Sequence, residues 1–416
     1  MTGQGIAAAT SERLIDGRYA WFRLGVSMLL GTIASVGMWA VVVVLPNVQA
    51  ELEVSRADAS LPYTLTMVGF ALGNVVFGRL VDRLGIVLPV VLAAVALGSG
   101  FVLAAFTTSI WQFAIVQGAL IGIGTASTFG PLIADISHWF RVRRGVAVAA
   151  TASGNYLAGV VWPNAMQGIL ISEGWRTTYI VIGIICIATM IPLALLLRRR
   201  PPVEVGPATP QPAGKGTQAV STPLSPAALQ MLLIVAGVGC CVAMSMPQVH
   251  IVAYCSDLGY GVARGAEMLS LMLAGGVISR VGSGFLADRI GGVPTVLVGS
   301  LGQCLALILY MPFDGLASLY IVSLIFGLSQ GGIVPSYAII VREYLPAKEA
   351  GQRVGLVIMA TVFGMALGGW LSGWIYDLTG SYRAAFLNGI AWNLLNIAIM
   401  LTILGRTRAP RTPQSA

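Results

Sequence analysis

The chain has 416 residues, of which 56% are hydrophobic and only 10% are charged, and its formal net charge is +8 at pH 7. This composition excludes an ordinary soluble domain, in which about a quarter of the residues are charged. It also argues against nucleic-acid binding, because Lys and Arg cluster in short segments between apolar runs and form no basic face. We therefore expect an integral membrane protein.

Twelve apolar segments are long enough to cross a bilayer as helices, which takes about 20 predominantly apolar residues. The six in the first half are 20–49, 59–80, 86–106, 110–139, 144–170 and 177–197. Six more follow at 227–255, 265–287, 293–311, 316–342, 352–375 and 383–404. The sequence thus predicts an all-α membrane protein with twelve transmembrane helices in two pseudo-symmetric six-helix bundles, 1–197 and 227–416. The proline-rich stretch 198–226 between them is expected to be a linker.

Most of the 24 basic residues fall on one side of this arrangement, in both terminal segments and in the linker and loops on the same side. Because cytoplasmic loops carry an excess of Lys and Arg, we expect both termini and the linker to be cytoplasmic. The first twenty residues are mixed and charged and show no convincing signal peptide. The short loops favour a bacterial inner membrane. We separately expect membrane lipid as the surrounding partner and a monomer as the functional unit.

One charged pattern occurs in both halves, each time after the second span of its half. It reads GRLVDRLG from Gly78 to Gly85 and GFLADRIG from Gly284 to Gly291. A repeat at half the chain length indicates two homologous bundles, and such proteins bind their substrate at the interface of the repeats.

The charged residues of this repeat predict a gate on the cytoplasmic side. We expect inter-helix ion pairs that close this side when the cavity opens outward, and that break on switching. The residues proposed for this gate are Arg79, Asp82, Arg83, Asp135, Asp288 and Arg289. Within it, Asp135 is expected to pair with Arg79 or Arg83.

Arg280 is the sharpest candidate for binding a substrate. It lies eight residues before Asp288 in span eight, roughly 12 Å from the cytoplasmic boundary and near the middle of the bilayer. A guanidinium there costs several kcal/mol unless it is paired or faces water, and its span has no acidic residue one turn away. We expect Arg280 to face a central cavity and to bind a carboxylate with its planar fork. The alternative is a structural arginine bonded to backbone carbonyls.

Other polar residues in the spans are weaker candidates. Four of them could line the cavity or could equally bond a neighbouring helix: Asn155, Gln330, Tyr337 and Trp39. His250, near the outer end of span seven, is the candidate for proton coupling because imidazole titrates near physiological pH. Two distant histidines, and cysteines without CxxC spacing, predict no metal site. No cofactor is expected beyond a co-transported proton.

Taken together, these residues resemble the major facilitator superfamily across essentially the whole chain, because G-x-x-x-D-R-x-G is similar to its signature after span two. A narrower resemblance is at Trp139 to Ala150, WFRVRRGVAVAA, which is similar to the F-x-x-R-R-x-x-A signature of monocarboxylate transporters. That resemblance implies transport of lactate or pyruvate with a proton. It also implies that the arginine in span eight, here Arg280, holds the substrate carboxylate.

The chain departs from the relatives in three places. Animal monocarboxylate transporters have an aspartate one turn before the arginine, where this chain has Gly276. They also carry a lysine in span one, which here has no ionisable residue from Val36 to Pro46. The related oxalate:formate exchangers have a lysine in span eleven, and Gly355 to Tyr376 contains no Lys or Arg.

These observations favour a secondary active transporter and not an enzyme. We expect proton-coupled symport of a small lactate- or pyruvate-like monocarboxylate by alternating access, because one cavity cation suits a monoanion. The alternative is a carboxylate antiporter of the oxalate:formate exchanger type. A transporter-like receptor is disfavoured because no signalling domain flanks the spans. A membrane enzyme is disfavoured because no nucleophile–base motif occurs.

Overall fold

The computed structural model describes residues 15–140, 143–199, 224–345 and 350–407, and all the regular structure in these ranges is helical. Eleven of the described helical segments are long and apolar enough to cross a membrane. The longest includes most of α9 (Arg144–Leu196), which breaks at Gly174, where φ is +80°. Because this break separates two crossings, the described chain has the twelve crossings predicted from the sequence.

The first bundle is formed by the helices that precede residue 200. They are α2 (Arg18–Ala34), α3 (Val36–Leu52), α4 (Arg56–Leu84), α5 (Val87–Ala105), α6 (Ile110–Val116), the π-helix η1 (Gln117–Gly122), α7 (Ile123–Ala126), α8 (Gly130–Ser137) and α9. The first crossing consists of α2 and α3, and the fourth consists of the short helices from α6 to α8. The linker expected between the bundles falls mostly on residues 200–223, outside the described ranges.

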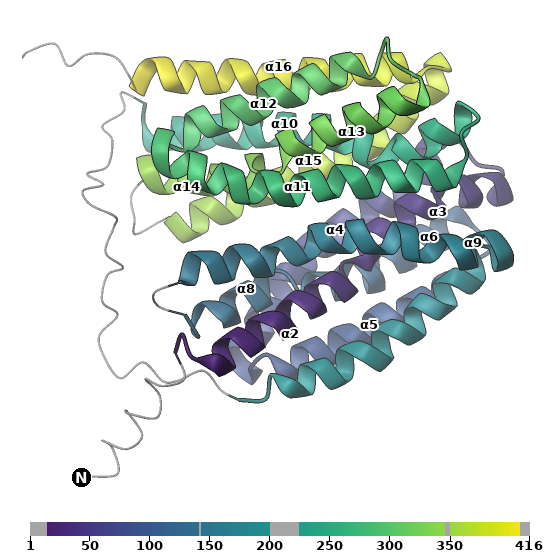
Figure 1. The fold of residues 1–416 in the computed structure, drawn as a ribbon, viewed down its shortest axis with the longest axis horizontal. Coiled ribbons are helices and arrows are strands. Elements are labelled where there is room, and N and C mark those ends of the chain that lie inside the picture. Colours follow the sequence, from purple (N-terminus) through teal and green to yellow (C-terminus); the bar gives the residue numbers. More distant parts are fainter. Residues whose placement is uncertain (1–14, 141–142, 200–223, 346–349, 408–416) are drawn as a thin grey trace, which may run out of the picture.

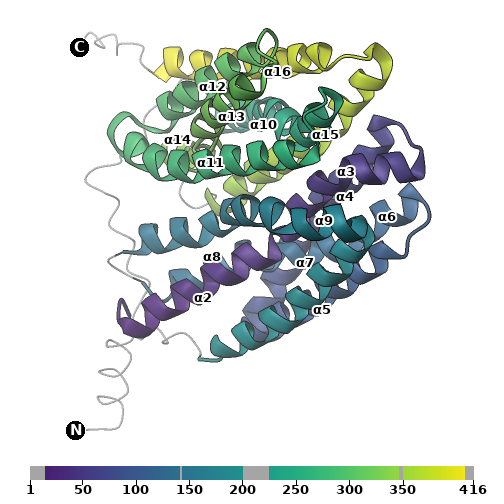
Figure 2. The ribbon, with the colours of Figure 1, turned by 45° about the vertical axis from the view of Figure 1, so that its right-hand side comes forward.

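The second bundle repeats this plan. Its helices are α10 (Pro226–Asp257), α11 (Val262–Ile290), α12 (Gly292–Leu309), α13 (Leu316–Gln330), α14 (Ile333–Tyr344), α15 (Ala350–Thr379) and α16 (Tyr382–Thr407). Its fourth crossing is also broken, between α13 and α14. Figures 1 and 2 show the two groups of helices packed side by side, with the start of α2 and the end of α16 at the same end of the molecule. We call this the terminal end and the opposite one the far end.

Glycines bring helix backbones into direct contact inside each bundle. A Cβ placed on Gly69 of α4 would lie only 2.0 Å from the carbonyl oxygen of Gly118 in η1. In the second bundle, a Cβ on Gly327 of α13 would lie 2.0 Å from the carbonyl oxygen of Met272 in α11. The second and fourth crossings of each half are therefore held together by the same close approach, which small residues permit in lipid.

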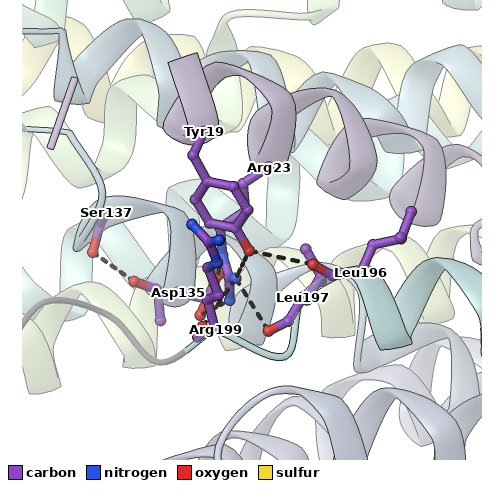
Figure 3. A network of polar contacts seen from close by, with 8 residues as sticks. Tyr19, Arg23, Asp135, Ser137, Leu196, Leu197 and Arg199 are labelled. Carbon is purple, nitrogen blue, oxygen red and sulfur yellow. Dashed lines mark hydrogen bonds and ion pairs between the residues drawn. The ribbon is translucent and has the colours of Figure 1, made fainter. Parts of the chain in front are cut away.

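A buried ion pair joins three helices of the first bundle at the terminal end (Figure 3). Arg23 of α2 is fully buried, and its Nε and Nη2 each donate to a carboxylate oxygen of Asp135 in α8 at 2.8 Å. Its Nη1 donates to the carbonyl of Leu197, just after α9, at 3.1 Å. The prediction that Asp135 pairs with Arg79 or Arg83 is wrong. Arg23 takes the carboxylate because a fully buried guanidinium requires a countercharge, whereas Arg79 and Arg83 are exposed to solvent.

Candidate functional site

A cavity of about 140 Å³ lies between the two bundles, near the middle of the crossings. Helices α3, α4 and α9 line it from the first bundle, and α10, α11, α14 and α15 line it from the second. Most of the lining side chains are apolar or aromatic. They include four methionines and five aromatic residues: Met38, Met67, Met244, Met365, Trp39, Tyr63, Phe70, Phe129 and Tyr156. Among the described residues that line it, Arg280 is the one charged side chain.

Arg280 bridges the two bundles at this cavity. Arg280 is on α11 in the second bundle, and its Nε donates to the carbonyl of Gly331 in the same bundle at 3.3 Å. Its Nη1 donates to the carbonyl of Ala152 in α9 of the first bundle at 3.1 Å. Its Cζ lies 4.2 Å from the ring centroid of Tyr156, also in α9. Arg280 forms no ion pair within the described ranges. It thus combines both readings of the sequence, because it bonds backbone carbonyls and also faces the cavity with its charge uncompensated.

Trp39 and Asn155 line the cavity together with Arg280. The indole Nε1 of Trp39 donates to the backbone carbonyl of Asn155 at 3.0 Å, which ties α3 to α9. The side-chain amide of Asn155 donates to the sulfur of Met38 at 2.9 Å. Of the residues proposed to bind substrate, the structure therefore brings three into one cavity.

Gln330 and Tyr337 are not among the cavity-lining residues. Each is buried within the second bundle and bonds a neighbouring helix, which was the other possibility left open by the sequence. Tyr337 donates its hydroxyl to Oδ1 of Asn396 in α16 at 2.8 Å. Gln330 accepts a bond of 2.8 Å from Nε2 of Gln248, and Gln248 itself lines the cavity. Gln248 is therefore a cavity residue that the sequence reasoning missed.

His250 lies in the interior of the second bundle and has no exposed surface. Its Nε2 is 2.8 Å from the carbonyl oxygen of Gly369 in α15, so Nε2 carries the proton and donates. Its Nδ1 is buried and has no hydrogen-bond partner in the described part of the chain. The ring of Tyr382 in α16 is 5.8 Å away. The imidazole is thus enclosed by three helices rather than placed at the surface near the helix end.

An ion pair joins the two bundles at the far end. Arg56, at the start of α4, is only 6% exposed. Its Nη2 donates to both carboxylate oxygens of Asp257 at the end of α10, at 3.1 and 3.0 Å. Its Nη1 donates to the hydroxyl of Tyr382 at 2.9 Å. One guanidinium of the first bundle is therefore held by two helices of the second.

Asp377 completes this contact by capping α4 from the opposite bundle. Its carboxylate accepts from the backbone N–H groups of Arg56 at 2.8 Å and of Ala57 at 2.7 Å. A helix N-terminus attracts negative charge, so this geometry is favourable. Gly373 permits the approach, because a Cβ there would lie 2.8 Å from the carbonyl oxygen of Arg56. We call Arg56, Asp257, Asp377 and Tyr382 the far-end latch; the sequence reasoning missed it.

The residues predicted for the gate lie at the terminal end. Its exposed residues are Arg79, Arg83, Asp288 and Arg289, and none of them forms an ion pair within the described ranges. The side chain of Asp82 lies outside what the structure describes. A Cβ on Gly78 or Gly284 would meet no atom within 4 Å. The described gate residues therefore form no ion pair between the bundles in this structure.

Two six-helix bundles that share a central cavity, closed by a latch at one end, define a membrane transporter. The chain belongs to the major facilitator superfamily, which matches residues 27–351 and 268–416.

Its relatives include transporters from animals and fungi. Monocarboxylate transporter 13 of Bos taurus is 27% identical over 390 residues, covering 91% of this chain and 86% of that protein. Monocarboxylate transporter 11 of Homo sapiens is 27% identical over 389 residues, covering 89% and 80%. The MFS-type transporter pynF of Aspergillus niger is 26% identical over 342 residues, covering 82% and 77%.

Solved structures agree on the fold. A bacterial homolog of the human lysosomal transporter Spinster, in an inward-facing and occupied conformation, superposes with a TM-score of 0.72 at 14% identity, covering 94% of this chain and 97% of that one. A mutant of the nucleoside transporter NupG gives a TM-score of 0.72 at 12% identity, covering 91% and 99%. The predicted fold class is therefore confirmed.

Proposed function

We propose that the protein is a secondary active transporter that carries a small monocarboxylate, lactate- or pyruvate-like, together with a proton. The observation that carries this proposal is Arg280, a cation at the bundle interface that lines the cavity without an ion pair. A partly buried cation without a countercharge is unfavourable, and a bound substrate anion would neutralise it. The monocarboxylate transporters among the relatives support the same class of cargo.

In this proposal the carboxylate binds Arg280 at Nη2, while Nε and Nη1 keep their bonds to the carbonyls of Gly331 and Ala152. A single cation favours a monoanion, because a second carboxylate in the same cavity would lack a partner. The short tail of the substrate would contact the methionines and aromatic rings, which adapt to small apolar groups. These contacts supply modest binding energy, as suits a substrate that must also leave.

Transport would proceed by alternating access, in which the two bundles rock about the cavity. We place the protein in the inner membrane of the cell. The positive-inside rule then predicts that the basic terminal end faces the cytoplasm. The structure then corresponds to a state closed outside by the far-end latch. Opening outward would break the bonds of Arg56 and Asp377, while Asp82, Arg83, Asp288 and Arg289 would come together at the cytoplasmic end. A monomer contains all of these parts.

His250 is the proposed site of the coupled proton. Its Nδ1 has no partner in the described chain, and its ring lies 5.8 Å from that of the latch residue Tyr382. Opening of the latch would admit water to this region, so that Nδ1 could accept a proton from the outside. Because a protonated imidazole is strongly disfavoured in a closed apolar interior, closure would have to follow the arrival of the carboxylate charge.

The test is uptake of labelled lactate into proteoliposomes at two external pH values. We expect uptake to rise with an inward acid gradient, to vanish in Arg280→Ala and to lose its response to pH in His250→Gln. Arg264→Ala is the matched control, because Arg264 is an exposed arginine paired with Glu267 on the same helix, α11. Active Arg280→Ala would refute the site, and pH-independent uptake would refute the coupling. Uptake that requires carboxylate inside the vesicle would show exchange instead of symport.

A further inference from the structure

Tyr156 forms the other half of the arginine site. It comes from α9 in the first bundle, is 7% exposed, and lines the same cavity as Arg280. The distance of 4.2 Å from the guanidinium carbon to its ring centroid is a close cation–π contact. One face of the guanidinium is therefore covered by an aromatic ring that carries no charge of its own.

Gly276 makes this stacking possible. It lies one turn before Arg280 on α11, and therefore on the same face of that helix. A Cβ on Gly276 would lie 2.6 and 2.7 Å from Cε1 and Cδ1 of the Tyr156 ring, closer than real Cβ atoms come to other atoms. Any side chain at this position would displace the ring. The ring thus fills the place from which an acidic side chain on α11 would reach the arginine.

The bonds of the guanidinium leave one group for a ligand. Nε and Nη1 are bonded to the carbonyls of Gly331 and Ala152, and one face is stacked on Tyr156. Within the described ranges Nη2 donates no hydrogen bond of normal length and angle, and the Tyr156 side chain interacts electrostatically with the guanidinium as well as stacking on it. Neither a carbonyl nor an aromatic ring neutralises a cation, so the arrangement fixes the direction of the guanidinium and keeps its full charge.

We propose that Tyr156, with the space provided by Gly276, is the positioning residue of the anion site. It holds Arg280 in the one orientation that offers Nη2 and a full positive charge to the cargo carboxylate. The inference rests on the proposed function, since it assigns the cargo to Arg280. It goes further in tying cargo affinity to a ring of the opposite bundle, so that the site is complete only when α9 and α11 are in contact.

A double-mutant cycle tests this relation. Tyr156→Leu should raise the KM for lactate roughly 30-fold, with a smaller change in kcat, because a desolvated cation–π contact contributes about 2 kcal/mol. Tyr156→Phe, which retains the ring, should restore most of this affinity. Gly276→Ala should be as impaired as Tyr156→Leu, whereas Gly282→Ala, where a Cβ meets open space on the same helix, should behave as wild type.

The double variant Gly276→Ala/Tyr156→Leu should be no worse than Tyr156→Leu alone, because the added methyl acts only through the ring. Additive losses would overturn the proposal, since they would mean that the two residues act independently. Equal KM values for Tyr156→Leu and Tyr156→Phe would overturn it as well.

A second measurement does not depend on transport. In protein labelled with ¹⁵N-arginine, the Nε–H signal of Arg280, assigned by its loss in Arg280→Lys, should be shifted upfield by the ring current of Tyr156. The shift should persist in Tyr156→Phe and disappear in Tyr156→Leu and Gly276→Ala. An unshifted wild-type signal would overturn the stacking inference even if lactate is carried. A shifted signal that no monocarboxylate perturbs would instead refute the proposed function.

Discussion

Neutralising Asp377 should shift the balance between the two open states of the transporter. In Asp377→Asn, the carboxylate that accepts from the N–H groups of Arg56 and Ala57, at 2.8 and 2.7 Å, becomes a neutral amide. The amide oxygen can still accept one bond. The other charge-assisted bond and the charge at the start of α4 are lost, and both act only while the far end is closed.

The expected size follows from those two losses. A hydrogen bond to a charged group contributes about 1.5–3 kcal/mol, and a charge at a helix N-terminus about 0.3–1 kcal/mol. Together they give about 2–4 kcal/mol, which corresponds to a roughly 30- to 700-fold change in the ratio of the two states. Because the contact joins the bundles rather than stabilising either one, the change should appear in this ratio and not in the folding of the bundles.

Electron–electron distance measurements can follow this ratio with spin labels on Leu84→Cys and Ile290→Cys, which leave the charged gate residues in place. Both positions are exposed at the terminal end, one in each bundle, and the five native cysteines are buried. The distance between the labels should shorten when the far end opens. Asp58→Asn is the control, since it removes a charge from the same helix start without touching the second bundle. A ratio within about threefold of wild type, or an equal shift in Asp58→Asn, would refute the reasoning.

Two further predictions concern stability, measured as thermal unfolding in detergent. Arg23→Met should destabilise the protein by about 3–5 kcal/mol, because it leaves the carboxylate of Asp135 buried and unpaired, and Asp135→Leu in the same chain should recover most of the loss; no recovery would contradict this account. Gly69→Ala should cost about 1–3 kcal/mol by forcing α4 away from Gly118. Gly78→Ala, whose Cβ meets no atom within 4 Å, should cost little, and equal losses would argue against the packing argument.

The fold could be predicted because bilayer thickness constrains every crossing in the same way. Length and apolarity alone locate the spans, and the repeat of Gly78–Gly85 at Gly284–Gly291 divides them into two halves. The depth of Arg280 followed from its distance along one helix to Asp288. Such one-dimensional reasoning succeeds where a single straight helix determines the answer.

It left the answer open, or missed it, where contacts between helices or a break within a helix determine which side chains meet. Gln330 and Tyr337 lie on either side of the break between α13 and α14, so helical periodicity does not carry from one to the other. The partners of Arg56 are Asp257 at the end of α10 and Tyr382 at the start of α16, far along the chain. No sequence spacing predicts this contact. The need for a glycine at position 276 could not be predicted for the same reason, because the ring that occupies the space comes from Tyr156 in the other bundle.

The glycine contacts inside the bundles have a mechanical consequence. Where backbones touch, as at Gly69 with Gly118 and at Gly327 with Met272, little can slide without steric overlap, so each half behaves as a stiff block. The interface between the bundles also contains long side chains such as Arg56 and Arg280, which can exchange bonding partners one at a time. Conformational change is therefore concentrated at the interface between the bundles. Substitutions at this interface should alter the transport rate, whereas substitutions within a bundle should alter the stability of the fold.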